Sequence, residues 1–206
     1  MRITLATLFC ILLGLLATKS VAGADQWELE LDKDGIRVYT QIEDPSPYKQ
    51  VKVTTTINAP MEKVIEILMA FSKYKTWMYQ VNESYLINQS DSSYYIFLLE
   101  DATWPMQNRY QVSKLDVHQH PNDTNIEFRS IPNYIEKRTD AIQIKQYEGY
   151  WALENRPDHR CSLEYVLIHN PGGSVPPWLA NFHALENPFQ SIANLKELAE
   201  RESIRP

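Results

Sequence analysis

The chain has 206 residues, of which 44% are hydrophobic, and it carries 20 basic and 26 acidic side chains for a formal net charge of −6. An acidic balance of this size argues against nucleic acid or an anionic membrane surface as the main partner. Two cysteines in the whole chain exclude a disulfide framework, so an apolar core must hold the fold together.

The first segment is typical of a secretory signal peptide. It reads MRITLATLFCILLGLLATKSVAGA, with Arg2 at its start, an apolar stretch from Leu5 to Ala17, and small residues before Asp25. This stretch is shorter than the roughly 20 residues that span a membrane comfortably. We therefore expect cleavage after Ala22 or Ala24, with a retained N-terminal anchor as the alternative.

Loss of the leader would leave a single domain. Residues 1–22 would be removed, and residues 23–206 contain no repeat, low-complexity tract or linker that divides them. The leader takes two basic residues with it, which leaves 18 basic against 26 acidic side chains. We expect an exported monomer, periplasmic in a Gram-negative host and secreted otherwise.

A hairpin, a strand and a helix are expected first in the domain. Residues 27–41 alternate around Asp34-Gly35, which is the strongest short signal for a hairpin. Residues 48–57 alternate and are rich in β-branched side chains, which favours a third strand. A helix then begins at Pro60, because a proline in the first turn has no hydrogen bond to lose.

Short strand-like segments follow as far as residue 169. They cover residues 94–99, 108–115, 125–130, 141–153 and 161–169. The turn at 171–173, Pro-Gly-Gly, ends the last strand, since glycine adopts turn conformations without a side-chain penalty.

The last segment, from Pro176 to about Arg201, is expected to be one long helix with a single buried face. Apolar side chains recur there at spacings of three and four, which places them on one side. They are Trp178, Phe182, Leu185, Phe189, Ile192 and Leu195. The predicted fold class is α+β, with one curved antiparallel β-sheet and a long C-terminal α-helix across its concave face.

Several segments, in this order, resemble a START domain, the steroidogenic acute regulatory protein-related lipid transfer module of the Bet v1-like helix-grip superfamily. They are WELELDKDGIRVY, the NAP at the start of the first helix, KYKTWMYQVNESYLI, WPMQNRY, GYW and NPGGSVPPWLAN. The chain departs from the family at Tyr110 and Asn170, where the family has aspartate. The resemblance implies a helix-grip fold whose sheet wraps around the C-terminal helix and encloses a hydrophobic tunnel.

The resemblance also suggests where a ligand would bind, although ordinary core packing is the alternative for each side chain. The candidate ligand-binding residues are Trp104, Met106, Arg109, Tyr134, Trp151, Leu153, Tyr165, Leu167, Trp178, Phe182, Phe189 and Ile192. An inward-pointing Arg109 would need a partner, either Glu100 or Asp101 or the polar head of a ligand. By resemblance, residues 131–137 are a candidate lid over the tunnel, together with the start of the last helix, and a plain loop with apolar anchors is the alternative.

We expect the protein to bind one hydrophobic molecule, a lipid or a sterol-like compound, for storage or transfer. It would need no cofactor and no metal, and its contact with membranes would be transient. His118 and His120 lie on one side of an extended segment, but two histidines without a third ligand are weak evidence for zinc. Cys161 lacks a basic neighbour in the sequence and is expected to be inert.

Two other functions stay open at this point. Relatives of the fold include cyclases and dehydratases, and such chemistry would require a titratable group in the tunnel, for which Glu100, Asp101 and His169 are the candidates. A filled tunnel with an exposed apolar patch would instead indicate an interaction module. Asn82, Asn88 and Asn122 each begin a glycosylation sequon, which matters only in a host that glycosylates exported proteins.

Overall fold

The computed structural model describes residues 27–102 and 106–204. The predicted signal peptide and Trp104 therefore lie outside the described residues. The strands are β1 (Glu28–Lys33), β2 (Ile36–Gln41), β3 (Gln50–Ile57), β4 (Val81–Ser90), β5 (Ser93–Glu100), β6 (Arg109–Gln119), β7 (Asp123–Ser130), β8 (Ile142–Gln143), β9 (Gln146–Arg156) and β10 (Arg160–Asn170). The helices are α1 (Met61–Met69), the 3-10 helix η1 (Phe71–Thr76), α2 (Pro177–His183) and α3 (Glu186–Ser203).

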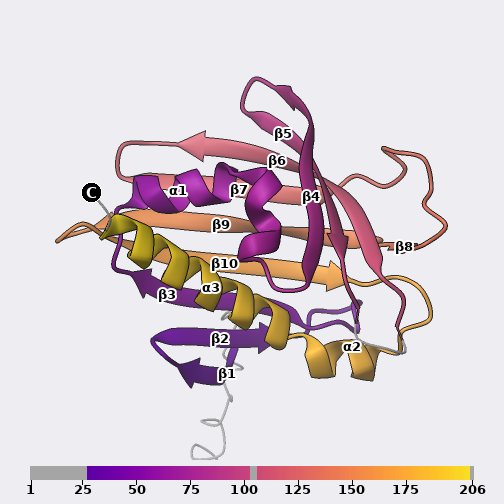
Figure 1. Ribbon diagram of the computed structural model, residues 1–206. Helices are drawn as coiled ribbons and strands as arrows, with labels where there is room; N and C mark the ends of the chain where they lie inside the picture. The colour runs from indigo at the N-terminus through magenta and orange to yellow at the C-terminus, as the bar shows by residue number, and fades with distance from the viewer. Residues whose placement is uncertain (1–26, 103–105, 205–206) are drawn as a thin grey trace, which may run out of the picture.

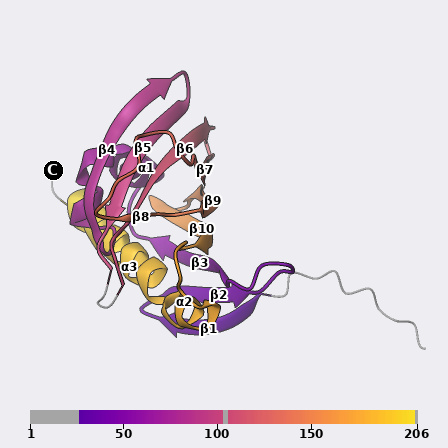
Figure 2. The same ribbon diagram turned by 90° about the vertical axis from the view of Figure 1, so that its right-hand side faces the viewer.

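The described strands form one curved sheet in the order β1-β2-β3-β10-β9-β7-β6-β5-β4, with β8 paired to β6. All neighbours along this path are antiparallel, and only the short β8–β6 pair is parallel. Figure 1 shows α3 lying across the sheet, and Figure 2 shows the sheet curving around α1 and α3. The predicted α+β helix-grip fold is confirmed.

The first elements form where the sequence predicts them. Asp34 and Gly35 both have positive φ angles, 54° and 72°, which is the conformation that a tight hairpin turn between β1 and β2 requires. Pro60 directly precedes α1, whose buried side chains all belong to the main core. They are Met61, Val64, Ile65, Ile67 and Leu68.

The main core lies between the concave face of the sheet and the helices α1 and α3. Ile192, Leu195 and Ala199 of α3 are completely buried in it, together with side chains from β2, β3, β9 and β10. Gly149 in β9 is required by close packing, because an added Cβ would lie 1.9 Å from the backbone oxygen of Val166 in β10. The sheet and α3 are thus a tightly packed unit.

The single C-terminal helix predicted from Pro176 onward is wrong, because the segment forms two helices, α2 and α3, separated at Ala184 and Leu185. The physical reason is Pro188, which has no N–H to donate to the carbonyl of Ala184 and whose ring would clash with that carbonyl. The proline is tolerated because it lies in the first turn of a new helix.

The burial expected for the first half of this segment is also wrong. Trp178 and Phe182 are 71% and 77% exposed, and α2 has no buried side chain. In contrast, Ile192 and Leu195 in α3 are buried as predicted.

The predicted lid at residues 131–137 packs on the outer face of the sheet. The ring of Tyr134 stacks on Tyr95 of β5, with 5.0 Å between centroids, and Ile135 packs against a small cluster around Phe97 and Tyr110. These rings lie on the face of β5 and β6 opposite the main core. No residue of this segment is part of the cavity wall described below, so its placement as a lid is corrected.

Among the described residues, no helix is both long and apolar enough to cross a membrane. The same part of the chain contains no group of three or more histidine, cysteine or carboxylate side chains that could hold a metal ion.

Candidate functional site

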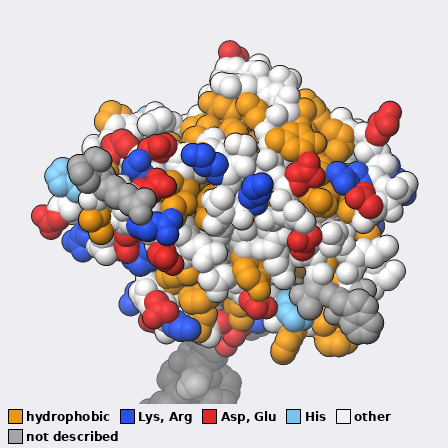
Figure 3. Space-filling view, in the orientation of Figure 1, with side chains coloured by type: hydrophobic (Ala, Val, Ile, Leu, Met, Phe, Trp, Pro, Cys, Tyr) orange, Lys and Arg blue, Asp and Glu red, His pale blue; other side chains and the backbone are white. Residues whose placement is uncertain are grey.

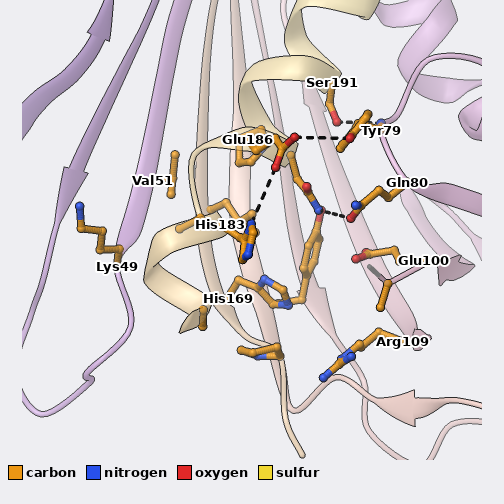
Figure 4. A pocket seen from close by; sticks show the side chains of 18 of the residues that line it. Lys49, Val51, Tyr79, Gln80, Glu100, Arg109, His169, His183, Glu186 and Ser191 are labelled. Carbon is orange, nitrogen blue, oxygen red and sulfur yellow. Dashed lines mark hydrogen bonds and ion pairs between the residues drawn. The ribbon is translucent and has the colours of Figure 1, made fainter. Parts of the chain in front are cut away.

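A cavity of about 160 Å³ opens between the concave face of the sheet and the two C-terminal helices. Its walls come from β9 and β10 with the loop that follows β10, the ends of β5 and β6, the turn before β4, residues 48–51 at the start of β3, and α2 with the start of α3 (Figure 4). Residues far apart in the sequence therefore meet there, which is typical of a binding site at the open end of a curved sheet.

An aromatic wall is contributed by β9 and β10. Trp151 and Tyr165 lie directly opposite each other on these strands, and their rings stack with 4.0 Å between centroids. Tyr147, two pairs along the same face, shares a hydrogen bond with Tyr165 through their hydroxyl groups at 3.2 Å. Each tyrosine places an apolar ring against the cavity while its buried hydroxyl remains paired.

Polar side chains gather at the end of the cavity formed by β5, β6 and β10. Glu100 and Arg109 lie opposite each other on β5 and β6, and His169 comes from β10 (Figure 4). Arg109 is only 7% exposed, and its guanidinium donates to the backbone oxygen of Gln107. Among the described residues, Nε of Arg109 and Nε2 of His169 have no hydrogen-bond partner. Two buried polar atoms are thus available to a ligand.

The charges at this end affect each other's protonation. Burial raises the pKa of Glu100 to about 7, although the nearby Arg109 opposes the shift. Burial, with the positive charge of Arg109 acting in the same direction, lowers the pKa of His169 to about 4. Glu100 therefore titrates near neutral pH, while His169 is neutral there.

Hydrogen bonds fix the start of α3 to the turn before β4. Oγ of Ser191 accepts a hydrogen bond from the backbone N–H of Tyr79 at 3.0 Å, and Nδ2 of Asn187 donates to Oε1 of Gln80 at 2.9 Å. The Tyr79 hydroxyl also contacts Glu186 at 3.5 Å. This side of the cavity is firmly held.

Helix α2, in contrast, is held mainly through one side chain. Oδ1 of Asn181 accepts a hydrogen bond from the backbone N–H of Lys49 at 2.8 Å, and its Nδ2 donates to the backbone oxygen of Pro47 at 3.0 Å. One side of α2 lines the cavity with residues such as Leu179 and Ala180. The aromatic rings of Trp178 and Phe182 are exposed, and hydrophobic side chains are visible at this end of the molecule in Figure 3.

Apart from Trp104, which lies outside the described residues, the predicted site residues fall into four groups. Five line the cavity: Met106, Arg109, Trp151, Tyr165 and Leu167. Three pack in or against the main core instead: Leu153, Ile192 and Phe189. Tyr134 lies on the outer face of the sheet, and Trp178 and Phe182 are exposed on α2. Ligand binding by any of these residues stays a prediction.

Sequence reasoning missed Tyr147, which a stricter use of strand alternation would have found, because it has the same parity as Trp151. Glu100, Asp101 and His169, named from the sequence as candidate titratable groups, all line the cavity. The contributions of Gln80 and Asn187 had no sequence signal, because they depend on how α3 meets the turn before β4.

No protein-family model matches the chain. The sequence is 26% identical over 189 residues to an uncharacterized protein of Pseudomonas aeruginosa, covering 90% of this chain and 94% of that protein. It is also 26% identical over 176 residues to the phosphatidylcholine transfer protein of Mus musculus, covering 80% of this chain and 79% of that protein.

Solved structures share the fold. The STAR-related lipid transfer protein from Xanthomonas axonopodis is 28% identical, with a TM-score of 0.80, covering 85% of this chain and 99% of that chain. A Streptomyces aromatase/cyclase matches with a TM-score of 0.57 at 16% identity, covering 74% of this chain and 94% of that chain, and shares the fold alone. The predicted resemblance to START domains is confirmed.

Proposed function

We propose that this START-like chain binds one lipid or sterol-like molecule in the cavity under α2 and carries it between membranes. The observation that carries the proposal is the arrangement of the cavity wall, in which the aromatic and aliphatic side chains of β9, β10 and α2 adjoin a polar end formed by Glu100, Arg109 and His169. Burial of the apolar part of a ligand would supply affinity, at roughly 25 cal/mol per Å². The polar end would fix its orientation. The lipid-transfer names of the Xanthomonas and mouse relatives support this proposal.

The cavity must enlarge to accept such a ligand. Its volume of about 160 Å³ is well below the ~300–1,000 Å³ typical of sites for drug-sized molecules. Helix α2 is the element best suited to move, because it buries no side chain and ends where the helical segment is interrupted. We infer that ligand entry requires α2 to swing away from the β2–β3 loop.

The exposed rings of α2 suit brief contact with a bilayer. Trp178 and Phe182 are large, amphipathic or apolar side chains of the kind that partition to membrane interfaces. The helix, PWLANFH, contains no Lys, Arg, Asp or Glu, so inserting it buries none of these charges. Contact there would place the moving element and the membrane together.

The compartment is inferred from the first residues of the chain. A signal peptide at residues 1–22 would deliver the domain, residues 23–206, across a membrane. There it would shield an apolar molecule from water, in the periplasm if the host is Gram-negative. Expression of the full chain, followed by N-terminal sequencing of the exported form, tests this part of the proposal.

A vesicle assay tests lipid transfer. Donor vesicles of phosphatidylcholine that contain a fluorescent, self-quenched phospholipid are mixed with unlabelled acceptor vesicles, and dequenching is followed with and without protein. We expect catalytic amounts of the wild-type protein to accelerate transfer, and Arg109→Met to reduce it. Arg129→Met, at an exposed position of β7, is the matched control. No acceleration with any phospholipid or sterol would contradict the transfer proposal.

One observation favours an enzyme as a second candidate. Glu100, with a pKa of about 7, lies in the cavity wall and could exchange a proton with a bound substrate near neutral pH. A cyclase or dehydratase would convert its ligand, whereas a carrier would release it unchanged. Mass spectrometry of the ligand before and after incubation separates the two, and Glu100→Gln should abolish any turnover while binding persists.

A further inference from the structure

Two polar side chains are buried on β6 without hydrogen-bond partners. Gln111 is 1% exposed and Ser113 is 2% exposed. Neither the carbonyl oxygen nor the amide nitrogen of the Gln111 side chain, nor the hydroxyl of Ser113, makes a hydrogen bond within the described residues. Buried polar groups are almost always paired, since an unpaired one loses its bonds to water without compensation. These two side chains therefore need an explanation.

Their position relates them to the cavity. Alternate residues of a strand share a face, so Gln111 and Ser113 lie on the same concave face as Arg109, which is part of the cavity wall. At ~3.4 Å per residue, Gln111 lies about 7 Å beyond Arg109 along the strand. Its neighbour on β5 is Leu98, and that of Ser113 is Ile96, both in the main core.

The unpaired polar side chains on this face of β6 end at Ser113. Leu115, the next residue on the same face of β6, is a buried member of the main core. The unpaired groups are thus confined to the part of the strand that adjoins the cavity. Neither is part of the cavity wall at its volume of about 160 Å³. Along the concave face of β6, Gln111 is the next side chain beyond Arg109, so a ligand that extends past Arg109 along this strand would meet Gln111 first.

We propose that Gln111, with Ser113 beside it, forms an inner polar subsite that selects lipids with an uncharged hydrogen-bonding group. A carboxamide both donates and accepts and carries no charge, so it fits a hydroxyl, an amide or an ester. This group would lie about 7 Å deeper than the part of the ligand that meets Arg109. The inference rests on the proposed function and specifies the class of ligand.

A pair of probes with matched chains tests the subsite. Monopalmitoylglycerol has two hydroxyl groups and an ester, and hexadecane has no polar group. Each is delivered from cyclodextrin, and binding is followed by the fluorescence of tryptophan, since Trp151 is part of the cavity wall. For the wild-type protein we expect tighter binding of monopalmitoylglycerol. Gln111→Leu should weaken that binding about tenfold and leave hexadecane unaffected.

Stability of the ligand-free protein provides a second readout. Because the Gln111 amide is unpaired when no ligand is bound, Gln111→Leu should raise the melting temperature while it lowers affinity for the polar probe. Gln111→Met, which is unbranched, serves if leucine disturbs the packing. Gln119→Leu makes the same chemical change at an exposed position of β6 and should alter neither readout.

The outcomes distinguish this inference from the proposed function. If Gln111→Leu and Gln111→Met weaken both probes equally, or lower the melting temperature, Gln111 is a packing residue and the subsite is overturned. If the wild-type protein binds both probes equally well, the subsite fails while lipid binding stands. If the wild-type protein binds neither probe nor any phospholipid, the proposed function fails as well.

Discussion

The two helices that end the chain, α2 and α3, differ in what covers them. In α3, Ile192 and Leu195 are completely buried against the sheet, whereas α2 leaves Trp178 and Phe182 exposed and buries no side chain. Both helices come from one apolar pattern with helical spacing. The difference teaches that such a pattern identifies an apolar face but leaves open whether the protein, a ligand or a membrane covers it.

The largest expected effect separates the two helices by stability. Leu195→Ala removes a fully buried side chain of α3 and should cost about 2–5 kcal/mol in the free energy of unfolding. Phe182→Ala removes an exposed ring of α2 and should change it by less than about 0.5 kcal/mol. Urea denaturation measures both free energies. A comparable loss of stability in the two variants would contradict the distinction between the buried helix α3 and the exposed helix α2.

The pH dependence sharpens the comparison at the polar end of the cavity. His169 binds a proton near pH 4 in the folded state, against an ordinary pKa of 6.5, so the unfolded chain binds more protons between these values and stability rises with pH there. Glu100, shifted from 4.5 to about 7, has the opposite effect, and stability falls as pH rises through that range.

Removing His169 and removing Glu100 should therefore change the pH dependence of stability in opposite directions. Relative to the wild-type protein, His169→Gln should lose about 1–2 kcal/mol as pH rises from 4 to 6.5, and Glu100→Gln should gain a similar amount from 4.5 to 7. Denaturation at a series of pH values follows both differences. Parallel pH profiles for the two variants would show that burial does not control these groups.

Exposed rings on α2 should matter for transfer rather than for binding. The double variant Trp178→Ala, Phe182→Ala should slow lipid transfer between phosphatidylcholine vesicles about tenfold, while affinity for a lipid delivered from cyclodextrin stays unchanged. Tyr85→Ala in β4 is a suitable control, because the Tyr85 ring is exposed and stacks on Phe97, outside the cavity wall. Equal loss of binding and transfer would place the two rings in the ligand site instead.

The smallest effect concerns the attachment of α2. Asn181→Ala removes two hydrogen bonds to the β2–β3 loop, each worth about 0.5–1.5 kcal/mol, and should favour the open position of the helix. We expect ligand release to accelerate about threefold to tenfold, measured by stopped-flow fluorescence. Asn194→Ala, which breaks a bond between α3 and the backbone of Trp77, should leave the release rate much less affected.

Much of the fold followed from local patterns. The Asp34-Gly35 turn, strand alternation and Pro60 before the first helix were sufficient because each depends on neighbouring residues. The interruption between α2 and α3 could also have been predicted, since Pro188 cannot donate the hydrogen bond that a continuous helix needs. The apolar pattern obscured this signal.

The candidate site was predictable only where one strand face defines it. Alternation puts Trp151, Tyr165 and Leu167 on one face, the resemblance to START domains turns that face inward, and all three line the cavity. The contact of α3 with the turn before β4 and the outward position of Tyr134 depend on tertiary packing, which a single sequence does not encode locally. Predictions for Trp104 concern a position outside the described residues.

The central claim is that the cavity holds one lipid. Native mass spectrometry of the protein after export, under conditions that preserve noncovalent complexes, tests it most directly when combined with organic extraction. The account predicts a mass increase equal to one lipid or sterol-like molecule, which the extract then identifies, and a reduced occupancy for Arg109→Met. A protein that remains empty after export and after incubation with phospholipids, sterols and monoacylglycerols would contradict it.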